Sequence, residues 1–115
     1  MELTQGFKLI VKEGRFKGFE FPLTEGENLI GRWDPESGSL PDVDLEQFDE
    51  EAKVSRLHAK IIIDGKRVML EDLSSQNGTY VNFPENRLQP GLPCSLQLGD
   101  NFQIGQTIFK LVAVG

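Results

Sequence analysis

The sequence predicts an all-β fold, either a sandwich or a barrel, built from about ten short strands. Three observations lead to this prediction. Short runs of apolar residues alternate with polar residues in the period of two that strands require. Turns that contain glycine separate these runs at short intervals. No part of the chain carries a long apolar stripe with the 3.6-residue period of a helix.

The first half of the chain predicts a hairpin and a short third strand. Residues 7–12 and 18–23 both alternate between apolar and polar side chains, and a turn with Gly14 separates them. After a turn at Gly26, residues 28–30 form a short strand that runs directly into Gly31. The residues that follow the third strand therefore lie at a strand end.

The stretch 33–51 is acidic and is interrupted by prolines and a glycine, which predicts a long loop. Residues 43–45 form a short, mostly apolar run that fits an edge strand. The spacing of Leu45, Phe48 and Ala52 is that of a helix, so a single helical turn is expected there.

The second half of the chain predicts two further hairpins. Residues 58–64 and 67–73 flank Asp64-Gly65, a dipeptide typical of tight hairpin turns. The last hairpin turns at Gly105 and Gln106. The other predicted strands are 79–81, 86–88, 95–98, 101–104 and 107–114.

The length and composition indicate one ordinary domain, residues 1–115, that can bury a core without disulfides or a metal. The sequence contains neither a membrane-spanning apolar run nor the pattern of a signal peptide. A single cysteine, Cys94, excludes an internal disulfide and fits a cytoplasmic protein. We interpret Cys94 as a small, partly buried apolar residue and not as a catalytic thiol.

The formal net charge of −6 argues against general nucleic-acid binding, because proteins that bind phosphate backbones are usually basic. The charge is uneven along the chain. Acidic residues crowd 34–51, and basic residues follow at Lys53, Arg56, Lys60, Lys66 and Arg67. A local basic spot on an acidic protein suits a small anionic ligand better than a polyanion.

The first candidate binding motif is Gly31-Arg32, at the end of a predicted strand. The Arg32 guanidinium can donate two parallel hydrogen bonds to a phosphate and is permanently charged. The alternative interpretation is a solvated loop arginine that pairs with a nearby carboxylate.

The second motif is Ser55-Arg56-Leu57-His58, just before a predicted strand. The Ser55 hydroxyl can donate to a phosphate oxygen, and Arg56 can add positive charge. A serine near a histidine also raises the possibility of a hydrolase, but no nucleophile elbow and no α/β pattern accompany it. We therefore expect His58 to connect loops through its two ring nitrogens.

The third motif, residues 74–79, contains Asn77-Gly78, which can adopt positive φ at low cost. The Asn77 amide could hold the backbone of an extended peptide, although a simple turn is the alternative. Asp42 and Asp44 could suggest a divalent metal, but no calcium-loop pattern follows them. We expect a solvated acidic loop there and no metal or other cofactor.

The order and spacing of these motifs resemble the forkhead-associated (FHA) domain family. The matching stretches are Asn28 to Arg32, Ser55 to His58, Asp72 to Asn82, and Leu98 to Asp100, so the resemblance covers nearly the whole chain. It implies an eleven-stranded β-sandwich of the FHA/SMAD-like kind, which binds phosphothreonine peptides through loops at one end.

The resemblance also implies roles for particular residues. Phosphate contacts are expected from Arg32, Ser55 and, at a variable position, Arg56. Peptide contacts are expected from Gln76 and Asn77. Support of the loops is expected from Gly31, His58, Gly78 and Thr79. The sequence departs from the family pattern in its long acidic segment between Arg32 and Ser55 and at Phe83, where a glycine is common.

We therefore expect a phosphothreonine-dependent binding module in signalling, monomeric as an isolated domain, with no nucleic-acid or membrane partner. An enzyme is not expected, because the sequence offers no plausible base, metal cluster or nucleotide loop. The alternative function is a phosphate-independent interaction domain that uses another face of the sandwich.

Overall fold

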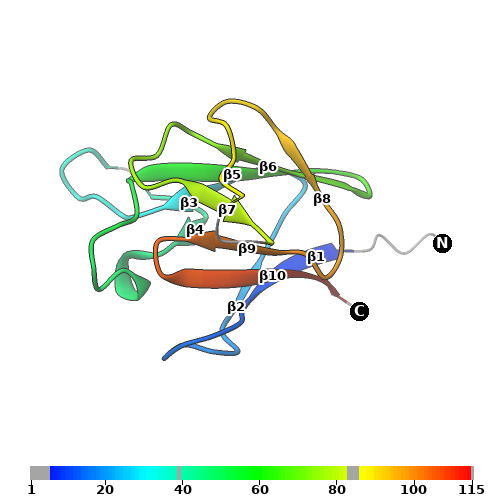
Figure 1. The fold of residues 1–115 in the computed structure, drawn as a ribbon, viewed down its shortest axis with the longest axis horizontal. Coiled ribbons are helices and arrows are strands. Elements are labelled where there is room, and N and C mark those ends of the chain that lie inside the picture. The colour runs from blue at the N-terminus through cyan, green and yellow to red at the C-terminus, as the bar shows by residue number, and fades with distance from the viewer. Residues whose placement is uncertain (1–5, 39, 83–85, 115) are drawn as a thin grey trace.

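The computed structural model describes residues 6–38, 40–82 and 86–114, which form two five-stranded β-sheets (Figure 1). The first sheet has the order β2-β1-β10-β9-β7, with β1 (Gly6–Val11), β2 (Glu20–Pro22), β7 (Thr79–Val81), β9 (Asn101–Ile104) and β10 (Thr107–Val114). The second has the order β4-β3-β5-β6-β8, with β3 (Gly26–Gly31), β4 (Val43–Asp44), β5 (Leu57–Asp64), β6 (Arg67–Asp72) and β8 (Cys94–Leu96). The predicted all-β sandwich is confirmed.

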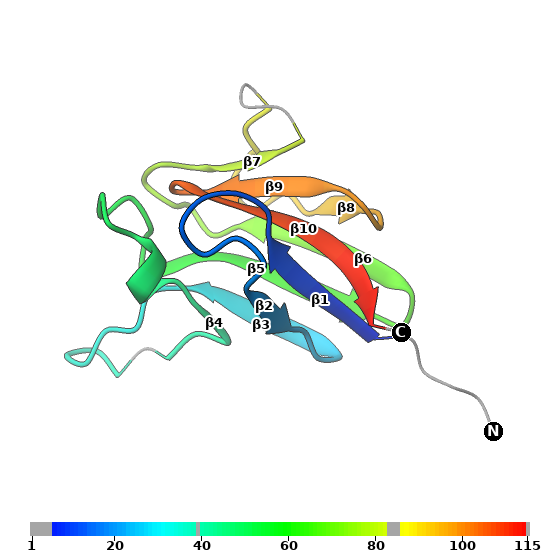
Figure 2. The ribbon, with the colours of Figure 1, turned by 90° about the horizontal axis from the view of Figure 1, so that it is seen from below.

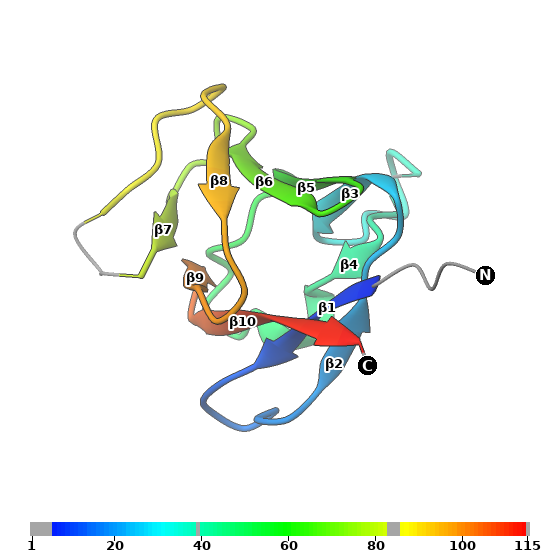
Figure 3. The ribbon, with the colours of Figure 1, turned by 90° about the vertical axis from the view of Figure 1, so that its right-hand side faces the viewer.

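The core lies between the two layers, which Figure 3 shows with β1 and β10 facing β3, β5 and β6. Alternate residues of β1, Phe7, Leu9 and Val11, are buried, as the two-residue period requires. Within the same sheet, the rings of Phe102 and Phe109 stack with their centroids 5.1 Å apart. Phe109 lies opposite Val11 in the β1–β10 pairing and opposite Phe102 in the β10–β9 pairing.

The number of strands differs from the family expectation. The described residues contain ten strands and not eleven. The predicted strand at residues 86–88 forms only a single bridge, between Tyr80 and Arg87. The chain cannot extend this pairing far because Pro90, two residues after Leu88, has no backbone N–H to donate. The family departure at Phe83 lies outside the described residues.

The acidic segment, defined here as residues 34–51, is attached to the sandwich by short elements. Strand β4 pairs in parallel with the end of β3, and η1 (Glu46–Phe48) is the predicted helical turn. The Phe48 ring lies 4.4 Å from the Phe16 ring and 5.5 Å from the Phe21 ring, centroid to centroid. These aromatic contacts fix the C-terminal part of the segment against the first sheet.

Figures 1 and 2 place η1, the β3–β4 connection and the β6–β7 loop at one end of the sandwich. At the opposite end, Gly6 pairs with Val114. The loops that carry the three motifs therefore meet at the same end. No helix among the described residues is long and apolar enough to cross a membrane.

Candidate functional site

One polar pocket of about 260 Å³ lies among these loops, and we call it the loop-end pocket. All five residues predicted to contact phosphate or peptide line it, namely Arg32, Ser55, Arg56, Gln76 and Asn77. The chain just before Ser55 completes the lining with Ala52, Lys53 and Val54, which the motif analysis did not select. Residues from three separate loops thus face one small volume.

Gly31 allows the end of β3 to approach the chain before β5 very closely. A Cβ at this position would overlap the Arg56 carbonyl, so no other residue fits without backbone movement. The next residue, Arg32, donates its backbone N–H to that same carbonyl over 3.1 Å. The close approach places the Arg32 side chain at the wall of the pocket.

The Arg32 side chain is held by its own ε N–H, which donates to the Val54 carbonyl over 2.7 Å. Two carboxylates lie farther away, with Asp49 at 3.8 Å and Glu46 at 3.9 Å from guanidinium nitrogens. About a third of the side chain remains exposed. The guanidinium is therefore aimed by a backbone contact while part of it stays accessible.

His58 connects the two loops on either side of the pocket. Its Nδ1 accepts a hydrogen bond from the Ser55 backbone N–H at 3.0 Å, and its Nε2 lies 2.9 Å from the Gly78 carbonyl. Nε2 must therefore carry the proton and donate it to Gly78. The ring is fully buried, and this burial lowers the pKa of His58, so the neutral form is favoured.

The Ser55 hydroxyl oxygen accepts the Gln76 backbone N–H at 3.1 Å, which joins the same two loops at the pocket surface. The Asn77 amide donates to the Lys53 carbonyl at 3.0 Å. The sequence predicted that the Asn77 amide holds a peptide backbone, and in the structure this amide binds a backbone carbonyl of the protein itself.

We call residues 73–78 the tip loop, and a buried hydrogen-bond network holds it. The Asp72 carboxylate accepts the Thr79 hydroxyl at 2.7 Å and both the backbone N–H and the hydroxyl of Ser75. Ser75 Oγ in turn accepts the Gly78 N–H at 3.0 Å. Thr79 was expected to support the loop, whereas the buried roles of Asp72 and Ser75 were missed. The Asp-x-x-Ser spacing typical of side-chain-closed turns is the signal that could have identified them.

Each cation that lines the loop-end pocket has a carboxylate of the acidic segment nearby. Arg56 pairs with Asp34 at 2.8 Å, and Lys53 pairs with Glu51 at 3.2 Å. Hydrogen bonds from Ser37 and then Arg56 lower the pKa of Asp34 to about 2, and the Asp34 contact raises the pKa of Arg56. Carboxylates of the acidic segment thus partly compensate the positive charge of the pocket.

Asp49 differs from the other carboxylates of the acidic segment because its side chain is only 1% exposed. It accepts the backbone N–H of Lys53 at 2.7 Å and that of Val54 at 2.9 Å. Asp49 therefore shapes the chain that precedes Ser55. The sequence placed it among solvated acidic residues because nothing in its local pattern distinguishes it from Glu50 and Glu51.

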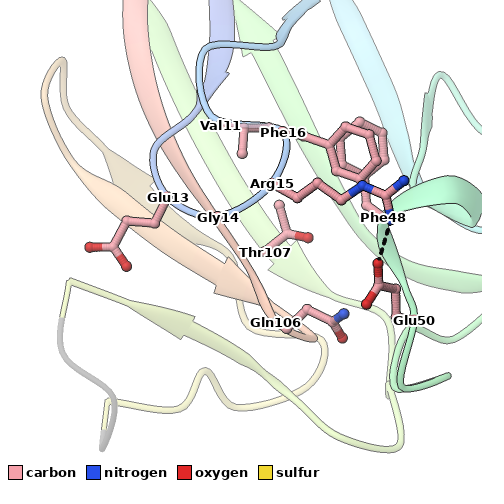
Figure 4. A pocket seen from close by; sticks show the side chains of 9 residues that line it. All are labelled: Val11, Glu13, Gly14, Arg15, Phe16, Phe48, Glu50, Gln106 and Thr107. Atoms are coloured by element: carbon pink, nitrogen blue, oxygen red, sulfur yellow. Dashed lines mark hydrogen bonds and ion pairs between the residues drawn. The ribbon is translucent and has the colours of Figure 1, made fainter.

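A second, smaller pocket of about 150 Å³ lies where the β1–β2 turn meets η1 and the β9–β10 hairpin (Figure 4). Arg15 reaches across it to Glu50 at 2.9 Å, and Phe16 lies against Phe48. These contacts fasten the C-terminal part of the acidic segment to the sandwich. Within the described residues, no group of three or more His, Cys, Asp or Glu side chains could hold a metal ion.

Comparison with known proteins identifies the family. The family model described as FHA domain matches residues 28–105. The chain is 46% identical over 87 residues to FraH of Nostoc sp., covering 70% of this chain and 30% of that protein. It is 36% identical over 104 residues to the glycogen accumulation regulator GarA of Mycolicibacterium smegmatis, covering 90% of this chain and 56% of GarA. The chain thus spans less than two thirds of these relatives.

A solved structure gives the same answer for the fold. A chain studied for phosphothreonine-dependent FHA domain interactions superposes with a TM-score of 0.73 and 29% sequence identity, covering 96% of this chain and 98% of that one. The family match, which includes all three motifs, and this structural likeness agree with the resemblance read from the sequence. The chain belongs to the FHA domain family.

Proposed function

We propose that the chain is a phosphothreonine-peptide binding module that mediates phosphorylation-dependent protein–protein interaction. The observation that carries the proposal is the convergence of Arg32, Ser55, Arg56, Gln76 and Asn77 on one pocket of an FHA domain. The structural likeness to an FHA domain described for phosphothreonine-dependent interactions supports the same ligand.

In this proposal the guanidinium groups of Arg32 and Arg56 hold the phosphate. Ser55 Oγ already accepts the Gln76 N–H, so its own proton is directed to an acceptor such as a phosphate oxygen. Asn77 and Gln76 contact the peptide on the other side of the pocket. Gly31, His58, Gly78 and Thr79 support the loops through the contacts described above.

We also propose that the domain has no catalytic activity. Both ring nitrogens of His58 are occupied by hydrogen bonds to the backbone, and burial keeps the ring from solvent. It therefore has no free nitrogen with which to activate Ser55. The physiological partner would be a threonine-phosphorylated protein, and the single cysteine is consistent with a cytoplasmic location.

We further propose that residues 1–115 act as one monomeric FHA domain. The family match begins after β1 and β2 and ends before β10. Strand β1 nevertheless pairs with both β2 and β10, and β10 pairs with β9 inside the matched region. Strands on both sides of the match therefore belong to the same sheet.

The test is a titration with three peptides of identical sequence that carry phosphothreonine, phosphoserine or unmodified threonine. A buffer above about pH 7 keeps the phosphate mostly doubly charged. We expect binding to the phosphothreonine peptide and none measurable to the unmodified one. Phosphoserine should bind about 10- to 200-fold more weakly, because it lacks the methyl group that a fitted recess would hold.

The same titration distinguishes the proposed function from the alternative, a phosphate-independent interaction domain. Equal affinity for phosphorylated and unmodified peptides would reject the proposal and favour a phosphate-independent interaction surface. Equal affinity for phosphothreonine and phosphoserine would leave a generic phosphate reader without a methyl recess.

A further inference from the structure

The tip loop contains a dipeptide, Asn77-Gly78, whose own chemistry makes it prone to hydrolysis. The backbone nitrogen of the residue after an asparagine can attack the side-chain amide carbon, and glycine hinders this attack least because it has no Cβ. The chain has five asparagines, and only Asn77 precedes a glycine. The other four precede leucine, arginine or phenylalanine. We therefore expect this reaction first at Asn77.

The surrounding structure requires both residues of this dipeptide. Gly78 has a φ of +88°, and a Cβ at this position would overlap the Arg87 side chain. Asn77 lines the loop-end pocket, and its amide donates to the Lys53 carbonyl, a hydrogen bond that a carboxylate cannot make. The backbone geometry and the pocket contact thus keep a reactive dipeptide at the loop-end pocket.

Both reacting groups are engaged by other parts of the protein in the folded loop. Gly78 is buried and donates its N–H to Ser75 Oγ at 3.0 Å, which shields this proton from solvent base. The Asn77 amide nitrogen, which is the leaving group, donates to the Lys53 carbonyl at 3.0 Å. Attack requires a deprotonated Gly78 nitrogen and a rotated Asn77 side chain, so both hydrogen bonds must break first. The reaction is therefore restricted to molecules in which the tip loop has opened locally.

We propose that Asn77 is a hydrolytic modification site, which is converted to aspartate or isoaspartate at a rate set by the opening of the tip loop. The Gly78 nitrogen loses its proton to solvent base and forms a bond to Asn77 Cγ. The Cγ–Nδ2 bond then breaks, and the amide nitrogen takes up a proton and leaves as ammonia. Water opens the resulting cyclic imide at either carbonyl. Overall, water is consumed and ammonia is released, with no change in oxidation state.

The modification should inactivate the loop-end pocket, and this part of the inference rests on the proposed function. A carboxylate at position 77 has no N–H for the Lys53 carbonyl, so two acceptors would face each other. It also adds negative charge to the pocket that Arg32 lines, where it would repel a phosphate. An isoaspartyl linkage lengthens the backbone before Gly78, whose carbonyl is bound by His58. Loss of the Asn77 amide should therefore end phosphopeptide binding.

The test follows the loss of the Asn77 amide by mass spectrometry in a mildly alkaline buffer. The proteins are the wild type, Ser75→Ala and Ser95→Ala, and a synthetic peptide of residues 71–82 gives the rate for the unrestrained dipeptide. Ser75→Ala removes the acceptor of the Gly78 N–H. Ser95→Ala is the matched control, because it makes the same change at an exposed position of β8. Thermal melting shows that each variant is folded at the temperature of incubation.

We expect the Asn77 amide to be lost more slowly in the wild type than in the synthetic peptide. The loss should be about 5- to 150-fold faster in Ser75→Ala than in the wild type, because removal of the acceptor favours local opening. Ser95→Ala should behave as the wild type does. A wild-type rate equal to that of the peptide, or equal rates in the two serine variants, would overturn control by the tip loop. The comparison of the wild type with the peptide needs no variant.

A second measurement titrates fresh and incubated wild-type protein with the phosphothreonine peptide. We expect the fraction of molecules that bind to fall in step with the fraction that retains the Asn77 amide. Full binding by the modified protein would overturn the inactivation. Failure of the fresh protein to bind any phosphopeptide would reject the proposed function, and the rates in the two serine variants would still decide the modification site.

Discussion

The two walls of the loop-end pocket are held in place by different kinds of interaction. The tip loop is held by buried hydrogen bonds that converge on Asp72 and by the buried ring of His58. The acidic segment faces the pocket mainly through exposed ion pairs, such as Asp34 with Arg56. Exposed pairs contribute little and weaken in salt, whereas an unsatisfied buried polar group is costly. We therefore call the tip loop, with Asp72 and His58, the preset wall. We call the acidic segment, whose exposed ion pairs can exchange partners, the adjustable wall.

At the pocket, this exchange means that a cation leaves a carboxylate of the protein for a phosphate oxygen of the ligand. In the proposed complex, a phosphate would offer Arg56 a stronger acceptor than the carboxylate it now contacts. The buried parts of the acidic segment are held by the protein itself, Phe48 by the Phe16 ring and Asp49 by the Val54 backbone N–H, so we expect them to stay in place. The comparison predicts that substitutions in the tip loop change folding and those in the exposed acidic positions change binding.

The largest effect is expected at Arg32, which lines the loop-end pocket and is proposed to contact the phosphate. Arg32→Ala should weaken phosphopeptide binding by about 2–5 kcal/mol, the range for removing one partner of a charge pair. Arg32→Lys should restore only part of the loss, because an ammonium group lacks the planar fork. Calorimetric titration measures both. Wild-type affinity in Arg32→Ala would show that phosphate is not bound here.

The preset wall is tested at Asp72. Asp72→Ala leaves the Ser75 and Thr79 donors without an acceptor and should lower the free energy of unfolding by about 2–4 kcal/mol. Urea denaturation measures the loss. Glu13→Ala, which removes an exposed carboxylate in the turn after β1, should change the same quantity by less than about 0.5 kcal/mol. Similar losses in both variants would contradict a special role for the buried network.

His58 makes the preset wall sensitive to pH. Its pKa is lowered in the folded state, so the unfolded chain binds the proton more readily. Stability should therefore be complete above the unfolded value of about 6.5 and decrease as the pH falls below it, by at most about 1.4 kcal/mol per pH unit from this group. His58→Gln removes the only histidine. This variant should be less stable at pH 7, but it should not show the loss of stability that protonation of His58 causes at lower pH. An unchanged pH slope in that variant would assign the effect to other groups.

The exchange of partners in the adjustable wall is tested at Asp34. Asp34→Asn removes the charge that competes for Arg56 and should strengthen phosphopeptide binding about 2- to 5-fold at low salt. Glu50→Gln is the control, because Glu50 pairs with Arg15 across the second pocket. Weaker binding in Asp34→Asn would mean that this carboxylate orients Arg56 for the ligand instead of competing with it.

The smallest effect concerns the choice between basic and acidic residues around the phosphothreonine. Carboxylates beside the pocket should favour basic peptide residues, and the exposed side chain of Glu51 is best placed to do so through Lys53. Glu51→Gln should reduce the preference for basic peptides about 2-fold at low salt. Asp49 is unsuited to this test because its carboxylate holds backbone N–H groups. If Glu51→Gln ranks basic and acidic peptides as the wild type does, any preference for basic peptides comes from other residues.

The fold could be read from the sequence where the signal is local. The alternation of Phe7, Leu9 and Val11 and the turn at Gly65 depend on neighbours in the chain, and both correspond to observed elements. The spacing of Leu45 and Phe48 likewise corresponds to η1. By contrast, whether residues 86–88 form a strand depends on how far they pair with a distant part of the chain. They form one bridge only.

The site was harder to predict where its contacts join distant parts of the chain. Arg32, Ser55 and Asn77 could be selected from their motifs, and the structure brings them to one pocket. The burial of Asp49 depends on how the chain before Ser55 folds back over it, which no local pattern records. The same is true of the contact between Asn77 and the Lys53 carbonyl, because the two residues are 24 positions apart.

The anchoring of the acidic segment at β4 and Phe48 has a consequence for protein engineering. The connection between Trp33 and Val43 is bounded on one side by β3 and on the other by β4, so its ends are fixed independently of its length. Each doubling of a flexible loop costs only about 0.6 kcal/mol in closure entropy. This connection is therefore a natural place to graft randomised loops, and a library built there would vary ligand preference on a constant scaffold.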